Sequence, residues 1–399
     1  MPLRSVDCSV IIPTRTRRAV LARTLKSLAE LPDHGFEVIV VDNGSTDGTL
    51  SLRSEFPAVH WIELGENRSS SARNAGAESA KGRVLLMLDD DSWPDPGVIG
   101  KVVRRMSDRP ELGAIACRVL LADSDGRHDA GGVPGIFFNC GGAVRRDAFL
   151  DVGGFPTDYD YYVEEYDLCC RLWQHGLCVE PHGDLIVHHR RTLENRDNNR
   201  MLRFLVRNNI ALWRKFAPPA LRDDLIASTV ERYARVARKE NASAGFEQGL
   251  QESKRHDNGT SDEVPLTLDQ FEHLFGIKTA RRVLREWADK RAIRRIAVWS
   301  RGKGCEQIVG LANSLGFHIH AVYDSPESIG HDRMWRGINL RACDGFNVQS
   351  VDGLVVGSLS PGVAEDISHA LGQKYESLPI ITLAPWLHMP SVREASVLG

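Results

Sequence analysis

Three consecutive carboxylates, Asp89, Asp90 and Asp91, are the side chains in this sequence best suited to chemistry. They come directly after the apolar run 84–88, which has the composition of a buried strand. Adjacent carboxylates repel one another unless a cation or solvent lies between them, and carboxylate oxygens are the ligands that Mg²⁺ and Mn²⁺ prefer. The cluster therefore predicts a divalent-metal site that bridges to a diphosphate. The alternative is a solvated acidic turn.

A second acidic strand end lies earlier in the chain. Asp42 follows the apolar run 38–41 and begins the segment Asp-Asn-Gly-Ser-Thr-Asp-Gly-Thr. Its carboxylate can accept a hydrogen bond from a nucleotide base or a ribose hydroxyl, while Asn43 and Gly44 form a tight turn. Between the two acidic strand ends, Arg73 offers a forked donor for phosphate. The alternatives are a capped turn without a ligand and an ordinary surface arginine.

The elements that must position these side chains alternate between strand and helix over residues 7–190. Strands are predicted at 10–12, 38–41 and 84–88, and a helix at 17–31. Continuous apolar runs separated by helices indicate a mostly parallel sheet that is covered on both faces. Such doubly wound sheets bind ligands at the carboxyl ends of their strands, which is where the acidic residues are expected.

The rest of the chain changes character twice. Residues 191–240 look helical throughout, and the polar stretch 239–263 indicates a linker or a mobile loop. A second α/β pattern then follows, with a helical stretch first and strands at 296–299, 318–323 and 353–356. The sequence therefore predicts two α/β regions that are separated by helices and a linker.

Composition excludes several classes of protein. The 399 residues carry 50 Lys and Arg against 53 Asp and Glu, and a net charge of −3 gives no sign of a nucleic-acid partner. No apolar run approaches the roughly 18–20 residues of a membrane-spanning helix. The first residues lack the apolar core of a signal peptide, so we expect a cytoplasmic protein. The eight cysteines form no CxxC pair and are expected to be reduced and mostly buried.

Six segments follow one another in an order and spacing that closely resemble the family 2 glycosyltransferases with the GT-A fold. They are 10–14 (Val-Ile-Ile-Pro-Thr), 40–49, 72–76 (Ala-Arg-Asn-Ala-Gly), 88–91 (Leu-Asp-Asp-Asp), 141–155 and 163–172. The resemblance covers roughly residues 7–216. It implies a GT-A type doubly wound, mostly parallel catalytic domain at 1–190, a basic helical segment and polar linker at 191–265, and a second, smaller Rossmann-like α/β domain at 266–399.

The resemblance also implies an inverting, divalent-metal-dependent enzyme that transfers a hexosyl or deoxyhexosyl group. The donor would be a nucleoside diphosphate sugar, with UDP the first expectation and dTDP the second. The acceptor would be a hydroxyl group of a glycan, a lipid-linked compound or a small molecule, and Mn²⁺ or Mg²⁺ would neutralise the leaving diphosphate. A rival class, a non-catalytic sugar-nucleotide-binding protein, would need broken acidic motifs, and these motifs are intact.

Matching positions carry the family's site residues onto this chain. Asp42 matches the base-binding aspartate, and Asp89 and Asp91 match the DxD pair, in which Asp91 is the expected direct metal ligand. The implied sites are nucleotide-sugar binding by Pro13, Thr14, Arg15, Asp42, Asn43, Arg73, Asp89 and Asp90; metal binding by Asp89, Asp91 and His188; and the acceptor side at Gly141 and Gly142. The histidine is chosen from the pair 188–189, and its alternative is a structural or surface role.

The general base is predicted within the segment Val-Glu-Glu-Tyr-Asp. In the family's usual Glu-Asp-x-Asp run the second acid is the base, and Glu165 stands at that place although it is a glutamate rather than an aspartate. We take Glu165 as the base, Glu164 as the second candidate, and Asp167 in a supporting role. The alternative is that all three are charges at a helix N-terminus, where the dipole favours them.

Residues 190–240 carry 13 Lys and Arg against six Asp and Glu. An amphipathic basic helix of this kind can contact a membrane surface or an anionic lipid-linked acceptor. That would place the protein peripherally at the inner face of the membrane. The favoured alternative is a helix packed on the catalytic domain with a solvated basic face.

The C-terminal region contains a strand, a glycine turn with Gly302 and Gly304, and a helix. Asp324 ends the next strand, 20 residues after Gly304, but Gln307 stands where a dinucleotide fingerprint has its third glycine. An NAD-linked sugar-modifying activity is the third class considered, and no Tyr-x-x-x-Lys pair follows the turn. We expect this domain to serve in interaction or as a homodimer contact.

Overall fold

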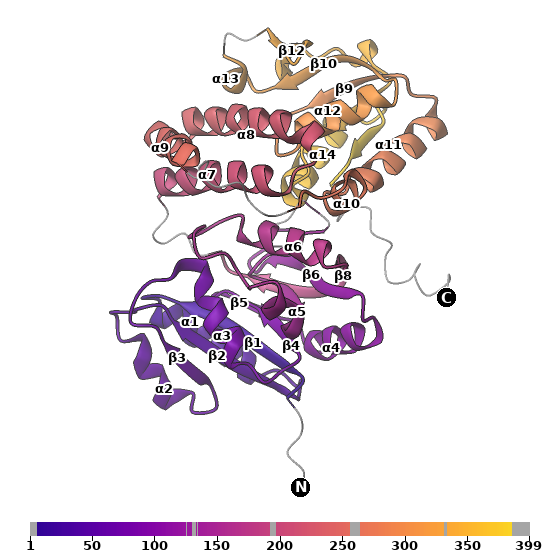
Figure 1. Ribbon diagram of the computed structural model, residues 1–399. Helices are drawn as coiled ribbons and strands as arrows, with labels where there is room; N and C mark the ends of the chain where they lie inside the picture. The colour runs from indigo at the N-terminus through magenta and orange to yellow at the C-terminus, as the bar shows by residue number, and fades with distance from the viewer. Residues whose placement is uncertain are drawn as a thin grey trace. The chain divides into compact units, whose positions relative to one another are not determined.

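The computed structural model describes residues 6–124, 126–129, 133, 135–191, 197–255, 264–330 and 333–384. The chain divides into two compact units (Figure 1). Of the described residues, those up to 129 and from 135 to 270 form the first unit, and residue 133 together with those from 271 to 384 forms the second. Each unit has its own sheet with helices, so the expected α/β class is confirmed. The three-part division at residues 190 and 265 stays a prediction.

The first unit is built on an eight-stranded sheet in the order β3-β2-β1-β4-β7-β6-β8-β5. Its strands are β1 (Cys8–Thr14), β2 (Phe36–Asp42), β3 (His60–Glu63), β4 (Val84–Met87), β5 (Ser92–Pro94), β6 (Leu112–Leu121), β7 (Gly142–Arg145) and β8 (Cys178–His189). The strands from β3 to β4 run parallel, as do β6 and β8, whereas β7 runs against both β4 and β6. The central strands β1 and β4 are almost fully buried, which is why they are continuous apolar runs in the sequence.

Helices cover this sheet and continue beyond it. They are α1 (Arg18–Ala29), α2 (Leu52–Glu55), α3 (Ala72–Ser79), α4 (Val98–Asp108), α5 (Arg146–Asp151), α6 (Glu164–Gln174), α7 (Asn198–Phe216), α8 (Pro219–Lys239), α9 (Ser243–Arg255) and α10 (Leu268–Leu274). Helix α3 packs on β1 and β2. A Cβ atom at Gly76 of α3 would come within 2.7 Å of the Ile11 side chain. Glycine at this position therefore lets α3 lie close to the sheet, and it sets the place of Arg73 at the start of the helix.

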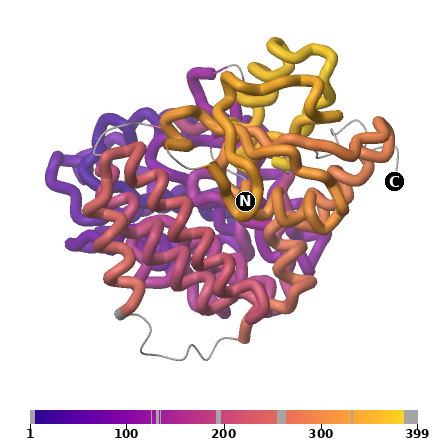
Figure 2. Tube along the Cα trace, turned by 90° about the horizontal axis from the view of Figure 1, so that it is seen from above, coloured from indigo at the N-terminus to yellow at the C-terminus, as the bar shows by residue number. Residues whose placement is uncertain are grey.

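Helices α7, α8 and α9 lie side by side in Figures 1 and 2. The expected linker over 239–263 is therefore wrong where it overlaps α9, and its part at 256–263 lies outside the described residues. Gly245 and Gly249, which suggested a loop, are four residues apart on α9 and face α7. Cβ atoms there would lie 2.0 Å from the carbonyl oxygen of Asn199 and 2.6 Å from that of Arg203. The glycines permit close helix packing.

The second unit contains a six-stranded sheet in the order β11-β12-β10-β9-β13-β14. Its elements are α11 (Ile277–Arg291), β9 (Arg295–Trp299), α12 (Cys305–Ser314), β10 (His318–Asp324), α13 (Pro326–Ile329), β11 (Met334–Trp335), β12 (Ile338–Ala342), β13 (Gly353–Val356), α14 (Pro361–Lys374) and β14 (Ile380–Thr382). All pairs are parallel except β11 with β12. The strand order reverses between β9 and β13, as in doubly wound dinucleotide-binding sheets.

None of the helices in the described ranges combines the length and the apolar character needed to cross a bilayer.

Replacing Gly249 by alanine tests the packing of α9 on α7. Alanine favours a helix by about 1 kcal/mol over glycine, yet its Cβ would meet backbone atoms of α7. We expect Gly249→Ala to lower the free energy of unfolding by about 1–3 kcal/mol, the usual cost of overpacking. Gly100→Ala in α4 is the matched control, because its Cβ would lie an ordinary 3.9 Å from the Asp33 carboxylate. Chemical denaturation of both variants measures the difference, and equal or greater stability of Gly249→Ala would contradict the close packing.

Candidate active site

The acidic residues predicted from the sequence lie at the carboxyl ends of adjacent strands. Asp42 is the last residue of β2 and is in register with Thr14, the last residue of β1. Asp89, Asp90 and Asp91 follow β4, which pairs with β1 on its other side. Because these strands are parallel, one edge of the sheet collects the acidic side chains.

Two arginines hold the three consecutive carboxylates. Arg17 donates to Asp90 at 2.5 Å and to Asp91 at 3.1 Å, and Arg73 donates to Asp89. Burial raises the pKa of Asp90 to about 7, because the effect of Arg17 is smaller and Asp91 adds repulsion. Asp90, Asp91 and Arg73 are all buried. The arginines therefore offset a repulsion that burial would otherwise make severe.

Asp89, Asp91 and His189 form a group suited to a metal ion. Their candidate ligand atoms all lie within 4.8 Å of one another. The Nε2 atom of His189 is 3.0 Å from a carboxylate oxygen of Asp91, and its Nδ1 atom is bonded to Asp129. Burial lowers the pKa of His189, but the hydrogen bonds with Asp129 and Asp91 outweigh it and raise the pKa to about 10. The far nitrogen is thus held by a carboxylate, as in many metal-binding histidines.

His188, the histidine chosen from the sequence, does not lie with this group. Its ring stacks on Trp93 with centroids 5.5 Å apart, and its Nε2 atom is 2.7 Å from Asp95. Successive side chains of a strand point to opposite faces, so only one of the two neighbouring histidines of β8 can face Asp91. His189 is the one that does.

Asp42 is almost fully buried and only partly satisfied. Its Oδ2 atom accepts from the backbone of Ser45 at 3.1 Å, while Oδ1 has no hydrogen-bond partner among the described residues. Asn43 differs, because both ends of its amide are used: it donates to the carbonyl of Ser69 and accepts from the backbone of Arg68. Asn43 therefore braces the turn, and Asp42 keeps an oxygen for a ligand.

The residues at the end of β1 lie beside the three consecutive aspartates. The hydroxyl of Thr14 donates to Asp90 at 2.9 Å, so this side chain orients the acidic cluster. Pro13 is half-buried and Arg15 is exposed beside it. Of the three residues predicted here, Thr14 is thus bonded to the cluster, and Arg15 is free to reach solvent.

The acidic pair Glu164 and Glu165 begins helix α6 and is almost fully buried. The side-chain amide of Asn139 donates to Glu164 at 3.0 Å, and its backbone N–H donates to Glu165 at 3.3 Å. Burial raises the pKa of both groups. The neighbouring Glu165 raises the pKa of Glu164 further, and Arg73 lowers the pKa of both groups. Hydrogen bonds from its own backbone and from that of Asn139 also lower the pKa of Glu165. The second carboxylate oxygen of Glu164 has no partner among the described residues.

Asp167 has a different environment. It accepts from Arg171 at 2.7 Å within α6 and from Lys215 of α7 at 3.2 Å, and its side chain is 1% exposed. Both carboxylate oxygens are thus bonded to cations, and Asp167 anchors α6 to α7.

Packing explains the two glycines predicted on the acceptor side. A Cβ atom at Gly142 would lie 2.1 Å from the ring of Phe137, and one at Gly141 would lie 2.7 Å from Val119. Both are at the start of β7, close to the segment that carries Asn139. The glycines therefore let this segment lie against the sheet.

The sequence does not single out three residues of the site, Arg17, Asp129 and Asn139, and His189 is the member of the histidine pair that was not chosen. Arg17 lies between the end of β1 and the start of α1. Its position three residues after Thr14, at a strand end, could have marked it as a residue of this site. Asn139 comes just before the glycine pair. Asp129 offers no local signal, because only the tertiary fold brings it to His189.

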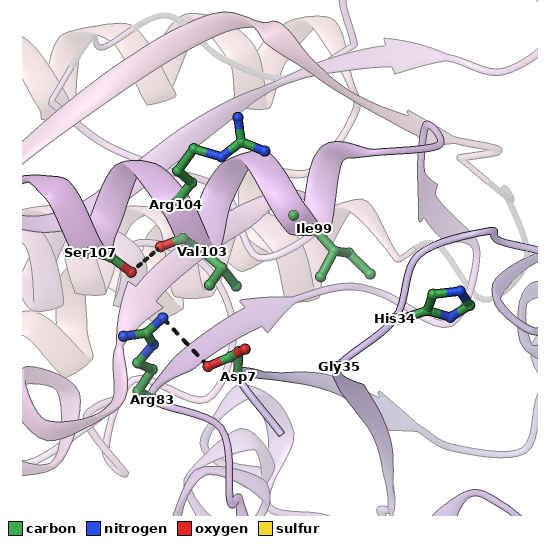
Figure 3. A pocket seen from close by; sticks show the side chains of 9 residues that line it. Asp7, His34, Gly35, Arg83, Ile99, Val103, Arg104 and Ser107 are labelled. Atoms are coloured by element: carbon green, nitrogen blue, oxygen red, sulfur yellow. Dashed lines mark hydrogen bonds and ion pairs between the residues drawn. The ribbon is translucent and has the colours of Figure 1, made fainter. Parts of the chain in front are cut away.

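A cavity of about 370 Å³ lies elsewhere in the first unit (Figure 3). Its lining includes Asp7, Gly35 and Arg83, which precede β1, β2 and β4. It is therefore at the amino ends of these strands, opposite the acidic cluster. Arg83 and Asp7 form an ion pair at 3.4 Å there.

Residues 9–130 match the protein family described as Glycosyl transferase family 2. An uncharacterised glycosyltransferase of Haemophilus influenzae is 28% identical over 193 residues, which are 42% of this chain and 62% of that protein. The glycosyltransferase AglE of Haloferax volcanii is 28% identical over 37% of this chain and 56% of its own length. A validoxylamine A glucosyltransferase of Streptomyces hygroscopicus is 39% identical over 24% of each chain. The chain thus spans less than two thirds of these relatives.

Among solved structures, a mannosyltransferase of Pyrobaculum calidifontis in complex with GDP-Man and Mn²⁺ is 20% identical to this chain. The superposition covers 72% of this chain and 84% of the mannosyltransferase, with a TM-score of 0.45. The family assignment rests on the sequence match, whose range contains Asp42, Arg73 and the three consecutive aspartates. This chain therefore carries a family 2 glycosyltransferase domain over residues 9–130.

Proposed function

We propose that the first unit transfers a sugar from a nucleoside diphosphate donor to an acceptor hydroxyl, with inversion at the anomeric carbon and with the help of a divalent metal. The observation that carries the proposal is the grouping of Asp89, Asp91 and His189 at a strand-end edge that also holds Asp42. A donor-binding edge and a separate pair of buried carboxyl groups are what such a transfer requires.

The donor side accounts for two polar atoms that the fold leaves unsatisfied. Asp42 Oδ1 and Arg73 Nε are buried without a partner among the described residues. In the proposal, Asp42 accepts from a base N–H, and UDP is the first candidate and dTDP the second. The guanidinium groups of Arg17 and Arg73 face the diphosphate, whose charge they match.

The residues present fit a divalent cation. Two carboxylates and an imidazole braced by Asp129 make an oxygen-and-nitrogen donor set that suits Mn²⁺ or Mg²⁺. When bound, the ion neutralises charge on the departing diphosphate. Asp89, Asp91 and His189 would hold it, and His189 must lose its proton to do so.

Glu165 is the proposed base. Two buried neighbouring carboxyl groups do not both ionise readily. The backbone N–H of Asn139 favours the ionised form at Glu165, whereas Arg73 acts on both groups. The proton then stays on Glu164. As the acceptor oxygen forms its bond to the anomeric carbon, its proton passes to Glu165 while the sugar–phosphate bond breaks and the diphosphate leaves from the opposite side. The product has the inverted configuration.

The remaining parts of the chain fit supporting roles. Arg203 of α7 is paired with Glu252 and Lys215 with Asp167, which supports a packed helix rather than a membrane-binding face. In the second unit, Arg301 donates to Asp324 at 3.0 Å, so the carboxylate expected to hold a ribose is already paired. This pairing argues against NAD binding there, and the role of the second unit in interaction or as a homodimer contact stays a prediction.

Asp91→Asn tests the metal site. The metal-dependent part of nucleotide binding should disappear, because an amide is a weak ligand for Mn²⁺, and transfer should be nearly abolished. The measurement is the thermal shift caused by UDP with and without Mn²⁺; a nucleotide at 100 times its Kd adds about 2.7 kcal/mol of stability. Asp95→Asn, at the carboxylate bonded to His188, is the control and should keep the shift. A Mn²⁺-dependent shift retained by Asp91→Asn would overturn the assignment.

Glu165→Gln tests the base. The amide keeps the shape of the side chain but cannot accept the proton, so donor binding should remain while transfer falls by roughly 10²–10⁴-fold. Release of nucleoside diphosphate under single-turnover conditions gives the rate. Glu164→Gln should have the smaller effect, and the reverse order would make Glu164 the base.

Glu164→Gln also tests burial of the acidic pair without any substrate. The folded-state pKa of Glu164 lies above its ordinary value of 4.5, so folding binds a proton and this group's stability contribution is lost as pH rises above that value. Glutamine has no such loss. The melting temperature of Glu164→Gln should therefore exceed that of the native protein increasingly from pH 5 to pH 8. Glu111→Gln is the control, because it changes an exposed carboxylate whose pKa is lowered. Its advantage in melting temperature over the native protein should not grow from pH 5 to pH 8.

A further inference from the structure

The segment 158–163, directly before the acidic pair, has an unusual backbone. Asp160, Tyr162 and Val163 have φ angles of 60°, 69° and 74°. A positive φ is unfavourable at each of these non-glycine residues, and a β-branched valine in this region is a genuine outlier. The conformation persists only where the surroundings hold it. Because Val163 is the N-cap residue directly before α6, this backbone sets the direction of Glu164.

Asn208 of α7 supplies the first hold on this segment. Its side-chain amide nitrogen lies 2.8 Å from the carbonyl oxygen of Tyr159, 2.9 Å from that of Tyr161 and 2.8 Å from that of Tyr162. Asn208 is 1% exposed. Three convergent carbonyls around one buried amide close the segment into a tight loop, and no other neutral side chain of this size offers two N–H donors.

Arg207, the neighbouring residue, holds the same loop. One of its terminal nitrogens donates to the carbonyls of Asp158 at 3.0 Å and Tyr159 at 2.8 Å, and lies 3.2 Å from the carboxylate of Asp160. The opposite side of the loop is held by Ser70, whose N–H and hydroxyl both donate to the carbonyl of Asp160. Ser70 comes just before α3, so the loop is tied to the donor side as well.

A second anchor on α7 lies on the other side of the acidic pair. Lys215 is seven residues, or about two helical turns, after Asn208 and is therefore near the same face of α7. It donates to Asp167 of α6 at 3.2 Å. Asn208 contacts the chain up to Tyr162, and Lys215 contacts it at Asp167. The two anchors thus bracket Glu164 and Glu165.

We propose that Arg207 and Asn208 are positioning residues for the base: they hold the strained loop that aims Glu164 and Glu165 at the acceptor side. The proposal rests on the proposed function, since it assumes a base in this pair. It makes α7, which lies outside the family match, part of the catalytic apparatus. The pair acts through the backbone of the loop and takes no proton itself.

The test compares Asn208→Asp with Asn209→Asp. Both change a buried asparagine of α7 to an isosteric carboxylate, but Asn209 donates to Leu205 and Tyr233 and does not touch the loop. The first readout is hydrogen exchange of the peptide that contains residues 158–167. The second is UDP release from UDP-glucose with Mn²⁺ and water as acceptor, and the third is the thermal shift by UDP and Mn²⁺.

We expect Asn208→Asp to speed exchange in the loop and to slow UDP release by roughly 10–100-fold, the scale of a displacement of about 1 Å, with the thermal shift by UDP and Mn²⁺ unchanged. Asn209→Asp should lower the melting temperature while UDP release stays within about twofold of the native rate. Arg207→Lys, which keeps the charge but loses the fork, is the milder variant if Asn208→Asp does not fold.

Two results would overturn the proposal. One is native exchange in the loop, or native UDP release, in a folded Asn208→Asp or Arg207→Lys protein. The other is an equal loss of UDP release in Asn208→Asp and Asn209→Asp, which would mean a general effect of a damaged α7. Glu165→Gln separates this from a failure of the proposed function: if that variant hydrolyses UDP-glucose at the native rate, the base itself is misassigned.

Discussion

Compensation of buried negative charge is the constraint on which the first unit depends. Its sheet collects carboxylates at one edge, and burying ionised groups costs several kcal/mol each unless they are paired. Arg17, Arg73 and His189 provide that pairing. The close approach of α3 at Gly76 and the alternation of β8 both serve to bring these cations to the edge.

The same constraint separates the roles of the acidic residues outside the cluster. Asp167 is fully paired and stabilises α6, whereas Glu164 and Glu165 are held mainly by the amide groups of Asn139. Neutral donors orient a carboxyl group without fixing its charge, so it can still exchange a proton. Asp167 thus differs from the proposed catalytic pair in having cationic rather than neutral partners.

The sequence predicted the parts of the fold whose signal is local. Strands β1, β2 and β4 are recognisable because a strand covered on both faces is apolar throughout. The sequence does not reveal which side chains of β8 face Asp91, because its two neighbouring histidines look equivalent until the orientation of the strand is known. Gly245 and Gly249 suggested a loop, since a glycine that permits close helix packing and one that permits a turn look the same. Asp129 depends wholly on tertiary structure.

The hydrogen bonds from Asn208 to the loop 158–163 have a consequence for folding during synthesis. Tyr159 and Asn208 are 49 residues apart, which at ribosomal rates of about 5–20 residues per second is a delay of roughly 2–10 s. All strands of this sheet have been synthesised by then, because β8 ends at His189. The sheet edge with Asp42 and the three consecutive aspartates can therefore form first, and the loop before α6 can take its final conformation only once α7 has emerged.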